Sequence, residues 1–380
     1  MTLLACTVSA QTPQTPADAA KDAGTQTKEK ENTGPAGFDI SGLIDMYYQY
    51  SFNHPPAGVN LMGRAWDVKN DSFTLTLLEL TAKRAPTKEV PVGITAVFNL
   101  GKTADLVHLT EPGTKSIRFL QQGYVTIPLA RRTSTTLDVG KFQAWACYDQ
   151  IEPTSTENYS RSLLYTLGEP FYHVGLRLTT NLSREWMGYV YLVNGWNNAE
   201  DDNGGKTIGA SLMYMPKIPF TFMLSYIGGD EGSDTVNSAG MFGGIGFMMP
   251  GVLNVQMVNF NTAWTPGRWK LAFNSDYASA AKPGMMGGHW NGQSLVLRYQ
   301  IDSAWAAAVR PEHFEDSDGL RTGAGQNLNS ITATLERRWH ENAITRLEYR
   351  HDHAASMFFP TKNGMSNNQD TITLAQLFRF

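Results

Sequence analysis

The residues with the clearest capacity for chemistry lie near the carboxy terminus, where His351, Asp352 and His353 follow Glu348. Imidazole and carboxylate groups in one place could bind a metal ion or transfer protons, as in a hydrolase. The surrounding residues alternate between apolar and polar, however, and successive side chains of a β-strand point to opposite faces. His351 and His353 would therefore point away from Asp352. With no nucleophile or metal-binding motif beside them, we predict that the protein is not an enzyme and needs no cofactor.

A second group of charged residues could act on ions or solutes without breaking bonds. In the segment 342–353, the apolar Leu347 and Tyr349 share one face of a period-two pattern and charged residues share the other. Segments 171–181 and 292–301 repeat this division. The charged side chains would thus face one interior, whereas a soluble barrel or sandwich encloses its apolar face. The residues predicted to line this interior are Arg177, Asp276, Arg298, Arg310, Glu312, Glu336, Arg338, Arg346, Glu348 and Arg350. Because both signs occur, we expect pairs within the wall and weak ion selectivity.

These faces belong to a chain that can be divided into strands from Gly37 onward. Sixteen strands are predicted, each near the nine to eleven residues that a tilted membrane strand needs. They are 38–50, 73–84, 90–100, 117–128, 135–147, 171–181, 186–196, 207–215, 219–228, 252–264, 268–279, 292–301, 304–314, 328–339, 342–353 and 369–380. Short connections such as 181–185 alternate with long polar excursions such as 197–206, which is the pattern of short periplasmic turns and long external loops. We therefore predict an all-β, transmembrane, antiparallel up-and-down β-barrel of about 16 strands.

The last predicted strand ends on an aromatic carboxy terminus. Its apolar face carries Ile372, Leu374, Phe378 and Phe380, and Gln376 interrupts that row. A barrel in the membrane must pair its last strand with its first so that no backbone edge faces lipid. A terminal Phe380 also resembles the signal read by the outer-membrane insertion machinery, which is therefore an expected partner.

Composition agrees with a membrane barrel. The chain has 35 Gly and 17% charged residues, against about 25% in ordinary soluble domains. Trp residues flank five of the short turns, where a periplasmic aromatic girdle would lie. They are Trp186, Trp264, Trp269, Trp305 and Trp339. The net charge of -4 and the lack of a basic run argue against a nucleic-acid partner. The longest uncharged stretch, 235–267, is broken by Gly and Pro and predicts no membrane helix.

The amino-terminal residues predict export. Residues 1–10 resemble the end of a truncated signal peptide with a small-residue cleavage pattern before Gln11. Cys6 could alternatively be lipidated. Residues 11–36 have almost no apolar content and predict a disordered periplasmic leader, so that the barrel would comprise 37–380.

The segment 137–198 carries a family resemblance. Its motifs are VGKF at 139–142, ENYSRS at 157–162, GEPF at 168–171 with His173 and Gly175 after it, and NGW at 194–196. Together they resemble the OmpL-like putative beta-barrel porin family of Gram-negative bacteria. The resemblance implies a channel in the bacterial outer membrane.

A barrel of this strand number leaves an aqueous lumen, so we predict passive diffusion of small hydrophilic solutes or ions. The third long loop, Tyr148 to Pro170, is the candidate constriction. Its candidate residues are Glu152, Glu157, Tyr159, Arg161, Tyr165 and Glu169. The alternative is that this loop caps the outside and never enters the pore. Outer-membrane lipid and lipopolysaccharide are expected partners, and a homotrimer is one possible assembly.

A binding role for the external loops is the main competing function. Glu200, Asp201 and Asp202 could hold a divalent cation that bridges lipopolysaccharide phosphates, although a solvated acidic loop explains them as well. The Gly-rich apolar segment 241–249 could form a subunit contact or close the mouth. Either feature would suit an adhesin or structural barrel, and a rim hydrolase is the weaker alternative.

Overall fold

The computed structural model describes residues 37–108, 119–130, 133–201, 203–231, 253–281 and 287–380. The predicted signal remnant with Cys6, the leader 11–36, Asp202 and the segment 241–249 lie outside the described residues. None of the helices in the described ranges is long and apolar enough to cross a membrane.

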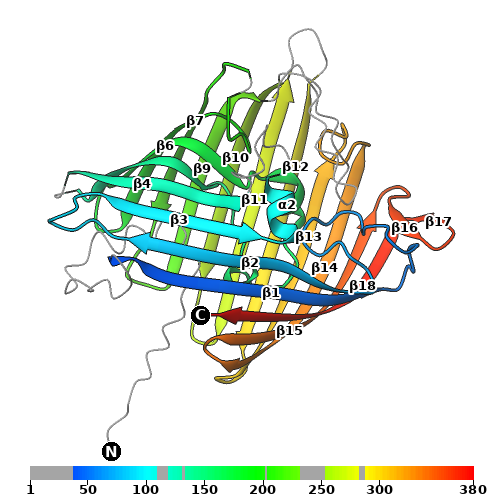
Figure 1. Cartoon of the computed structure of the whole chain (residues 1–380). Helices are drawn as coiled ribbons and strands as arrows, with labels where there is room; N and C mark the ends of the chain where they lie inside the picture. The colour runs from blue at the N-terminus through cyan, green and yellow to red at the C-terminus, as the bar shows by residue number, and fades with distance from the viewer. Residues whose placement is uncertain (1–36, 109–118, 131–132, 202, 232–252, 282–286) are drawn as a thin grey trace, which may run out of the picture.

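Within these residues, sixteen antiparallel strands form one closed barrel in which neighbours in sequence are neighbours in space (Figure 1). The strands are β1 (Asp39–Ser51), β2 (Ser72–Arg84), β3 (Gly93–Leu100), β4 (Leu120–Ala130), β5 (Thr135–Gln143), β6 (Tyr172–Asn181), β7 (Trp186–Val193), β8 (Thr207–Tyr214), β9 (Phe220–Glu231), β10 (Leu253–Trp264), β11 (Trp269–Ala281), β12 (Gly288–Gln300), β13 (Trp305–Asp316), β14 (Gln326–His340), β15 (Ala343–Ala354) and β18 (Asn368–Arg379). A small hairpin of β16 (Phe359–Thr361) and β17 (Gly364–Ser366) lies in the last long connection, and a short helix, α2 (Lys102–Val107), follows β3.

The predicted strands are confirmed, with differences at their ends. β12 begins at Gly288, four residues before its predicted start, because Gly288 already pairs with Ala280 of β11. β5 ends at Gln143 instead of 147. The chain turns away from the ladder there, since the backbone N–H of Ala144 donates to the carbonyl oxygen of Phe171 at 3.0 Å.

The barrel closes through its first and last strands, as predicted. β18, dark red in Figure 1, lies beside β1, and Leu43 pairs with Arg379 at the closing edge. Gly42 and Phe380 exchange backbone hydrogen bonds of 2.8 and 3.1 Å. A Cβ atom at residue 42 would lie 2.2 Å from the Phe380 ring, so a larger residue at this position would require that ring to move.

The two faces of the wall differ as the alternation predicts. On β15, Leu347 is 45% exposed, whereas Arg346 and Glu348 on the other face are 2% and 1% exposed. Four of the five predicted girdle residues are exposed beside the short turns, and Trp305 is half-buried. The apolar face therefore points outward and the charged face inward.

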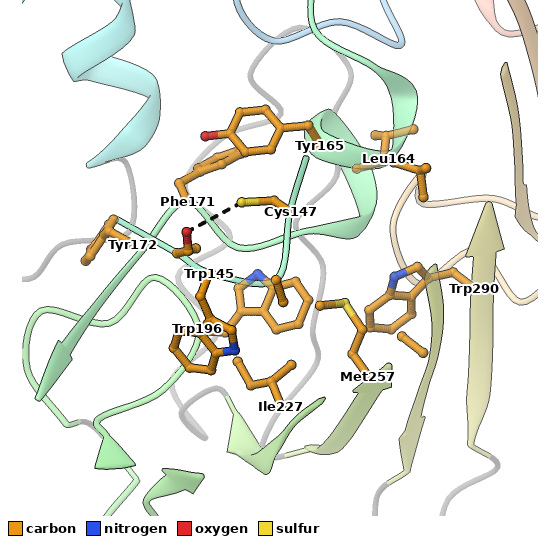
Figure 2. Close-up of a cluster of buried hydrophobic side chains, with 14 of the residues drawn as sticks. Trp145, Cys147, Leu164, Tyr165, Phe171, Tyr172, Trp196, Ile227, Met257 and Trp290 are labelled. Atoms are coloured by element: carbon orange, nitrogen blue, oxygen red, sulfur yellow. Dashed lines mark hydrogen bonds between the residues drawn. The ribbon is translucent and has the colours of Figure 1, made fainter. Parts of the chain in front are cut away.

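The inner face is not polar everywhere. Between β7 and β10 it carries apolar and aromatic residues, among them Tyr191, Ile227 and Met257, which form one buried cluster with residues from the long connections. Figure 2 shows Trp145, Ile227 and Met257 gathered in this cluster. The Trp145 and Tyr191 rings stack at 3.6 Å, and a Cβ atom at Gly209 would lie 2.2 Å from the Trp145 ring. Segments from the long connections thus cover much of the inner wall.

Candidate functional site

The connection between β5 and β6 folds into the barrel. We call residues 144–171 the crossing segment. It contains a 3-10 turn, η3 (Pro153–Ser155), and a π-helical turn, η4 (Leu164–Gly168), and most of its residues are buried. At its root, Asn197 Oδ1 accepts the backbone N–H groups of Phe171 and Tyr172 at 2.7 and 3.2 Å. Its tip, residues 153–163, contacts β13, β14 and β15, which lie half-way around the barrel from β5 and β6.

Two wall carboxylates receive the backbone N–H groups of the tip. Glu348 accepts from Tyr159 at 2.6 Å through Oε2 and from Ser160 at 3.0 Å through Oε1. Glu312 Oε2 accepts from Leu163 at 2.6 Å. Hydrogen bonds to ionised acceptors are stronger than neutral ones, so these contacts fix the height of the tip in the barrel.

Three wall arginines bind the carbonyl oxygens of the same segment. Arg310 Nη1 donates to Ser160 O at 2.6 Å, and Arg350 Nη1 donates to Arg161 O at 3.0 Å. Arg346 donates to the carbonyl oxygens of Pro153, Thr156 and Asn158 at 2.6 to 2.9 Å. The planar guanidinium presents several donors at fixed angles, which suits it to binding a loop backbone.

Each of these arginines also has an acidic partner in the wall. The N···O distances are 2.7 Å for Arg310 and Glu312, 2.8 Å for Arg346 and Glu336, and 2.7 Å for Arg350 and Asp352. The six side chains are buried. Removing the acid of such a pair would leave a buried arginine without its carboxylate partner, which costs about 3–5 kcal/mol. The paired wall is therefore a rigid platform for the crossing segment.

The crossing segment is also held by its own side chains. Arg161 donates to the carbonyl oxygens of Gln150 and Tyr159 at 3.2 and 2.8 Å. Its guanidinium lies 5.0 Å from the Trp66 ring, and that ring stacks on Tyr165 with centroids 5.7 Å apart. Arg161 and Tyr165 are therefore scaffold residues of the segment and do not face open lumen.

Two further acids of the segment bind wall residues. Glu157 pairs with Lys270 of β11. Burial raises the pKa of Glu157, but the Lys270 ammonium more than offsets this and holds that pKa below its usual value. Glu152 is half-buried, and its Oε1 accepts from Gln121 Nε2 at 3.0 Å.

Glu169 lies at the other end of the segment in a buried polar cluster. Its Oε1 accepts from Asn274 Nδ2 at 2.7 Å, and Asn259 donates to Asp276 at 2.5 Å in the same cluster. Burial, followed by the nearby Asp276 carboxylate, raises the pKa of Glu169 well above its usual value. Glu169 therefore keeps its proton to higher pH than an exposed glutamate.

The structure brings most of the predicted site residues together. Tyr159, Glu157 and the wall residues of β13 to β15 meet where the tip docks, and Tyr159 Oη donates to Asp45 Oδ1 at 3.0 Å. Arg177 lies apart from the tip, where it pairs with Asp138 at 2.7 Å. Of the six residues proposed for the constriction, five are buried and Glu152 is half-buried.

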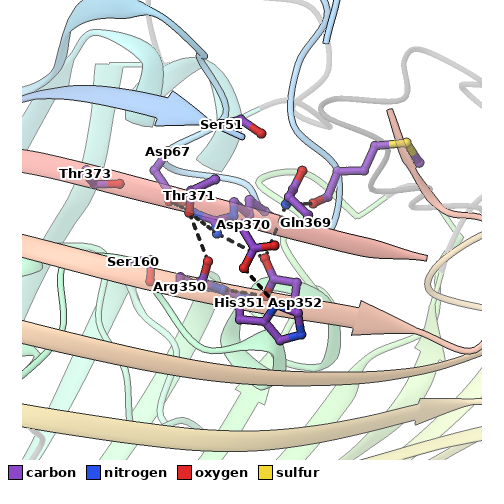
Figure 3. A network of polar contacts seen from close by, with 12 residues as sticks. Ser51, Asp67, Ser160, Arg350, His351, Asp352, Gln369, Asp370, Thr371 and Thr373 are labelled. Atoms are coloured by element: carbon purple, nitrogen blue, oxygen red, sulfur yellow. Dashed lines mark hydrogen bonds and ion pairs between the residues drawn. The ribbon is translucent and has the colours of Figure 1, made fainter. Parts of the chain in front are cut away.

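Sequence reasoning missed one buried polar network beside the tip. Arg64, from the first long connection, binds Asp67 at 2.6 Å, Asp352 at 3.0 Å and Thr371 Oγ1 at 2.7 Å. Figure 3 shows Asp67, Asp352 and Thr371 in this network. The residues before Arg64 follow no periodic pattern, so the sequence offers no signal that this loop turns inward.

The histidines of the possible catalytic cluster are separated from its acid. His351 Nδ1 lies 2.9 Å from Asp370 Oδ1, and His353 Nδ1 lies 2.8 Å from Asn368 Oδ1, both on the outward face of the wall. Asp352 points inward to Arg350. In the described part of the chain, no three His, Cys, Asp or Glu side chains are placed to hold a metal ion.

The acidic loop after β7 uses one of its carboxylates for its own turn. Asp201 Oδ1 accepts the backbone N–H groups of Asn203 and Gly204 at 3.1 and 2.8 Å, and Asp201 pairs with Lys206. The Lys206 ammonium holds the pKa of Asp201 below its usual value. These contacts within the loop therefore account for Asp201 without a bound cation.

A closed sixteen-strand barrel with an apolar outer face, a charged inner face and an inward-folded connection between β5 and β6 is an outer-membrane β-barrel of the porin class. The sequence matches the family described as putative beta-barrel porin-2, OmpL-like, over residues 37–380. The chain therefore belongs to this family, and the match extends the resemblance seen at 137–198 to the whole barrel.

Solved structures agree on the fold. The anion-selective porin of Comamonas acidovorans shares 10% identity, with a TM-score of 0.61, over 90% of this chain and 99% of that one. The trimer form of OmpT from Vibrio cholerae shares 8% identity, with a TM-score of 0.58, over 90% and 99% of the two chains. OmpF of Salmonella typhi, in complex with daunomycin, shares 11% identity, with a TM-score of 0.59, over 90% and 97%. No curated relative matches the sequence.

Proposed function

We propose that the protein is a diffusion channel for small hydrophilic solutes or ions, and that the crossing segment forms its constriction. The observation that carries this proposal is the docking of the tip through Glu348, Arg310 and Arg346 on the wall opposite its root. A segment held across the interior at mid-barrel narrows the lumen and sets the size of solute that passes.

The charged pairs behind the tip support a crossing segment that narrows the lumen rather than one that caps the outside of the barrel. An external cap would not need three buried arginines on the inner face to bind its backbone. Buried ion pairs contribute little net stability, so their presence is better explained by the need to position the tip. In this proposal Glu157, Tyr159 and Arg161 shape the constriction by fixing the backbone.

The membrane contacts and the assembly are part of the same proposal. The apolar outer face would contact lipid, with lipopolysaccharide around the external loops. Phe380 would present the terminal strand to the insertion machinery. A homotrimer is the proposed assembly, by analogy with the trimer form of OmpT from Vibrio cholerae.

Single-channel conductance of the refolded protein in planar bilayers tests the proposed function, together with liposome swelling on neutral sugars of increasing size. Stepwise openings and a sharp size limit are expected. Deleting residues 154–162 should raise both the conductance and the size limit, because this deletion removes the docked tip. A folded barrel that never conducts would contradict the proposal and favour an adhesin or structural role. Unchanged conductance after the deletion would contradict the constriction alone.

A further inference from the structure

Basic side chains gather on the inner face near the end of the barrel that carries the short turns. Each lies within the last or first three residues of its strand at that end. They are Lys83 of β2, Lys270 of β11, Arg298 of β12, Arg338 of β14 and Arg379 of β18. We call these five residues the basic ring. Lys270 and Arg298 are direct cross-strand partners, so two cations of the ring lie side by side.

The contacts of Lys270, Arg298, Arg338 and Arg379 show that these four side chains point inward. Arg298 and Arg338 both reach Glu336, at 3.2 and 3.7 Å. Arg379 Nη2 donates to Thr154 O of the crossing segment at 2.9 Å, and Lys270 pairs with Glu157 of the same segment. The basic ring therefore lies against the constriction, on its short-turn side.

Within these ion pairs, the basic side chains are more exposed than the carboxylates. The side chains of Lys270, Arg298 and Arg338 are 24%, 20% and 34% exposed, whereas those of Glu157 and Glu336 are each 7% exposed. The carboxylates thus lie behind the cations, and the surface that a solute meets is mainly positive. Acidic side chains are also accessible near this level. Asp39 lies opposite Lys83 and is exposed, and Glu152 is half-buried.

We propose that the basic ring makes the channel selective for small anions, either inorganic or carrying a carboxylate or phosphate group. This inference rests on the proposed function. Like charges that line a narrow, low-dielectric passage raise the local concentration of the opposite ion. Guanidinium groups also match carboxylate and phosphate oxygens geometrically. This proposal differs from the expectation of weak selectivity from a mixed wall, and the difference in exposure between the cations and the carboxylates supports it.

Reversal potentials in a tenfold KCl gradient test this proposal in planar bilayers. The wild-type channel is expected to favour Cl⁻ over K⁺, and less so as the salt concentration rises, because salt screens the ring. The double variant Arg298→Gln/Arg338→Gln should lower the Cl⁻ to K⁺ permeability ratio about threefold. Arg338→Lys should preserve the ratio. The matched control is Arg337→Gln, since Arg337 is the next residue on the opposite face, with its guanidinium 3.5 Å from the Trp339 ring.

The outcomes separate this inference from the proposed function. A conducting wild-type channel without anion preference would overturn the inference and leave the diffusion channel intact. The inference would also be overturned if Arg298→Gln/Arg338→Gln left the anion preference unchanged. Heat-shifted migration on gels would show that this variant is folded. A folded barrel without conductance would overturn both. The wild-type salt dependence needs no variant, so the inference is testable even if the double variant fails to fold.

Discussion

The carboxylate of Glu348 accepts the backbone N–H of Tyr159 at 2.6 Å, although 189 residues separate the two in sequence. Its other oxygen accepts the N–H of Ser160 at 3.0 Å. One buried side chain of β15 thus satisfies two adjacent backbone donors at the tip of the crossing segment. A buried N–H without an acceptor is costly, so Glu348 determines where the tip can lie.

Glu348→Ala should therefore loosen the tip, although the wall arginines still bind it. Hydrogen bonds to a charged group contribute about 1.5–3 kcal/mol each, and the variant loses the two that Glu348 accepts from the tip. We expect larger single-channel conductance and a larger size limit in the sugar-swelling assay. Glu341→Ala, in the exposed turn between β14 and β15, is the control and should behave as the wild type. A folded Glu348→Ala barrel with wild-type conductance would show that the Glu348 carboxylate is not needed to hold the tip in place.

The small size of residue 42 allows the Phe380 ring to lie on the closing edge. A Cβ atom there would lie 2.2 Å from that ring, so Gly42→Val should displace the ring and destabilise the barrel by about 1 kcal/mol, the lower end of the cost of overpacking, because the ring is exposed and can move. The measurement is the urea midpoint of the heat-modifiable form. In Gly42→Val/Phe380→Ala the clash is absent, so the loss in free energy of unfolding should be smaller than the sum of the losses in the two single variants. Ser41→Val, at the adjacent exposed position, is the control, and additive effects would argue against the contact.

The strands were predictable from the sequence because each depends on a local, period-two signal. Leu347 and Arg346 differ in exposure because they are consecutive residues of one strand, and no distant information is needed to assign their faces. The closing pair of β1 and β18 follows from the requirement that a membrane barrel has no free edge. Errors occur at strand ends such as Gln143, where the chain leaves the ladder to make a contact with Phe171.

The site was predictable only as a set of candidates. The sequence indicates that Arg310 and Glu348 face inward, but Arg310 binds Ser160 across 150 residues, and no local pattern encodes that pairing. The inward fold of the segment around Arg64 has no periodic signal at all. The difference in exposure between Arg338 and Glu336 likewise depends on packing, which no local pattern encodes.

Glu169 should make stability depend on pH. Its pKa is raised by burial and by Asp276, so the folded state holds the proton more tightly than the unfolded state. The resulting stabilisation is fully present below the usual glutamate pKa and is lost as the pH rises through the raised pKa. We expect the unfolding temperature in detergent to fall from mildly acidic to alkaline pH.

Glu169→Gln should reduce that decrease, because glutamine remains neutral at every pH. The control is Glu157→Gln. The pKa of Glu157 is lowered, so its contribution is present above the usual glutamate value and lost only as the pH falls through the lowered pKa. Glu157→Gln should therefore keep the alkaline decrease. If Glu169→Gln and the wild type lose stability equally towards alkaline pH, the buried carboxyl does not cause the effect.

Cys147 offers a direct readout of the crossing segment. Its side chain is 7% exposed within the segment, its Sγ donates to Ala144 O at 3.5 Å, and burial raises the pKa of the thiol well above its usual value (Figure 2). The reactive thiolate is therefore both scarce and shielded in the folded barrel. A charged maleimide should not modify Cys147 in the wild type until the protein is heat-unfolded. A cysteine placed at Ser155, which is half-buried, should react before unfolding and is the control.

The same thiol can separate local release of the tip from loss of the fold. In Glu348→Ala, the tip loses two of its anchoring hydrogen bonds, but the root stays bound by Asn197 and the apolar cluster around Trp145. Cys147 lies near that root, so we expect it to remain protected while a cysteine at Ser155 reacts faster than in the wild type. Rapid modification of Cys147 in the folded variant would show that the segment moves as one body. In that case the wall contacts of Glu348, rather than the root, hold the whole segment inside the barrel.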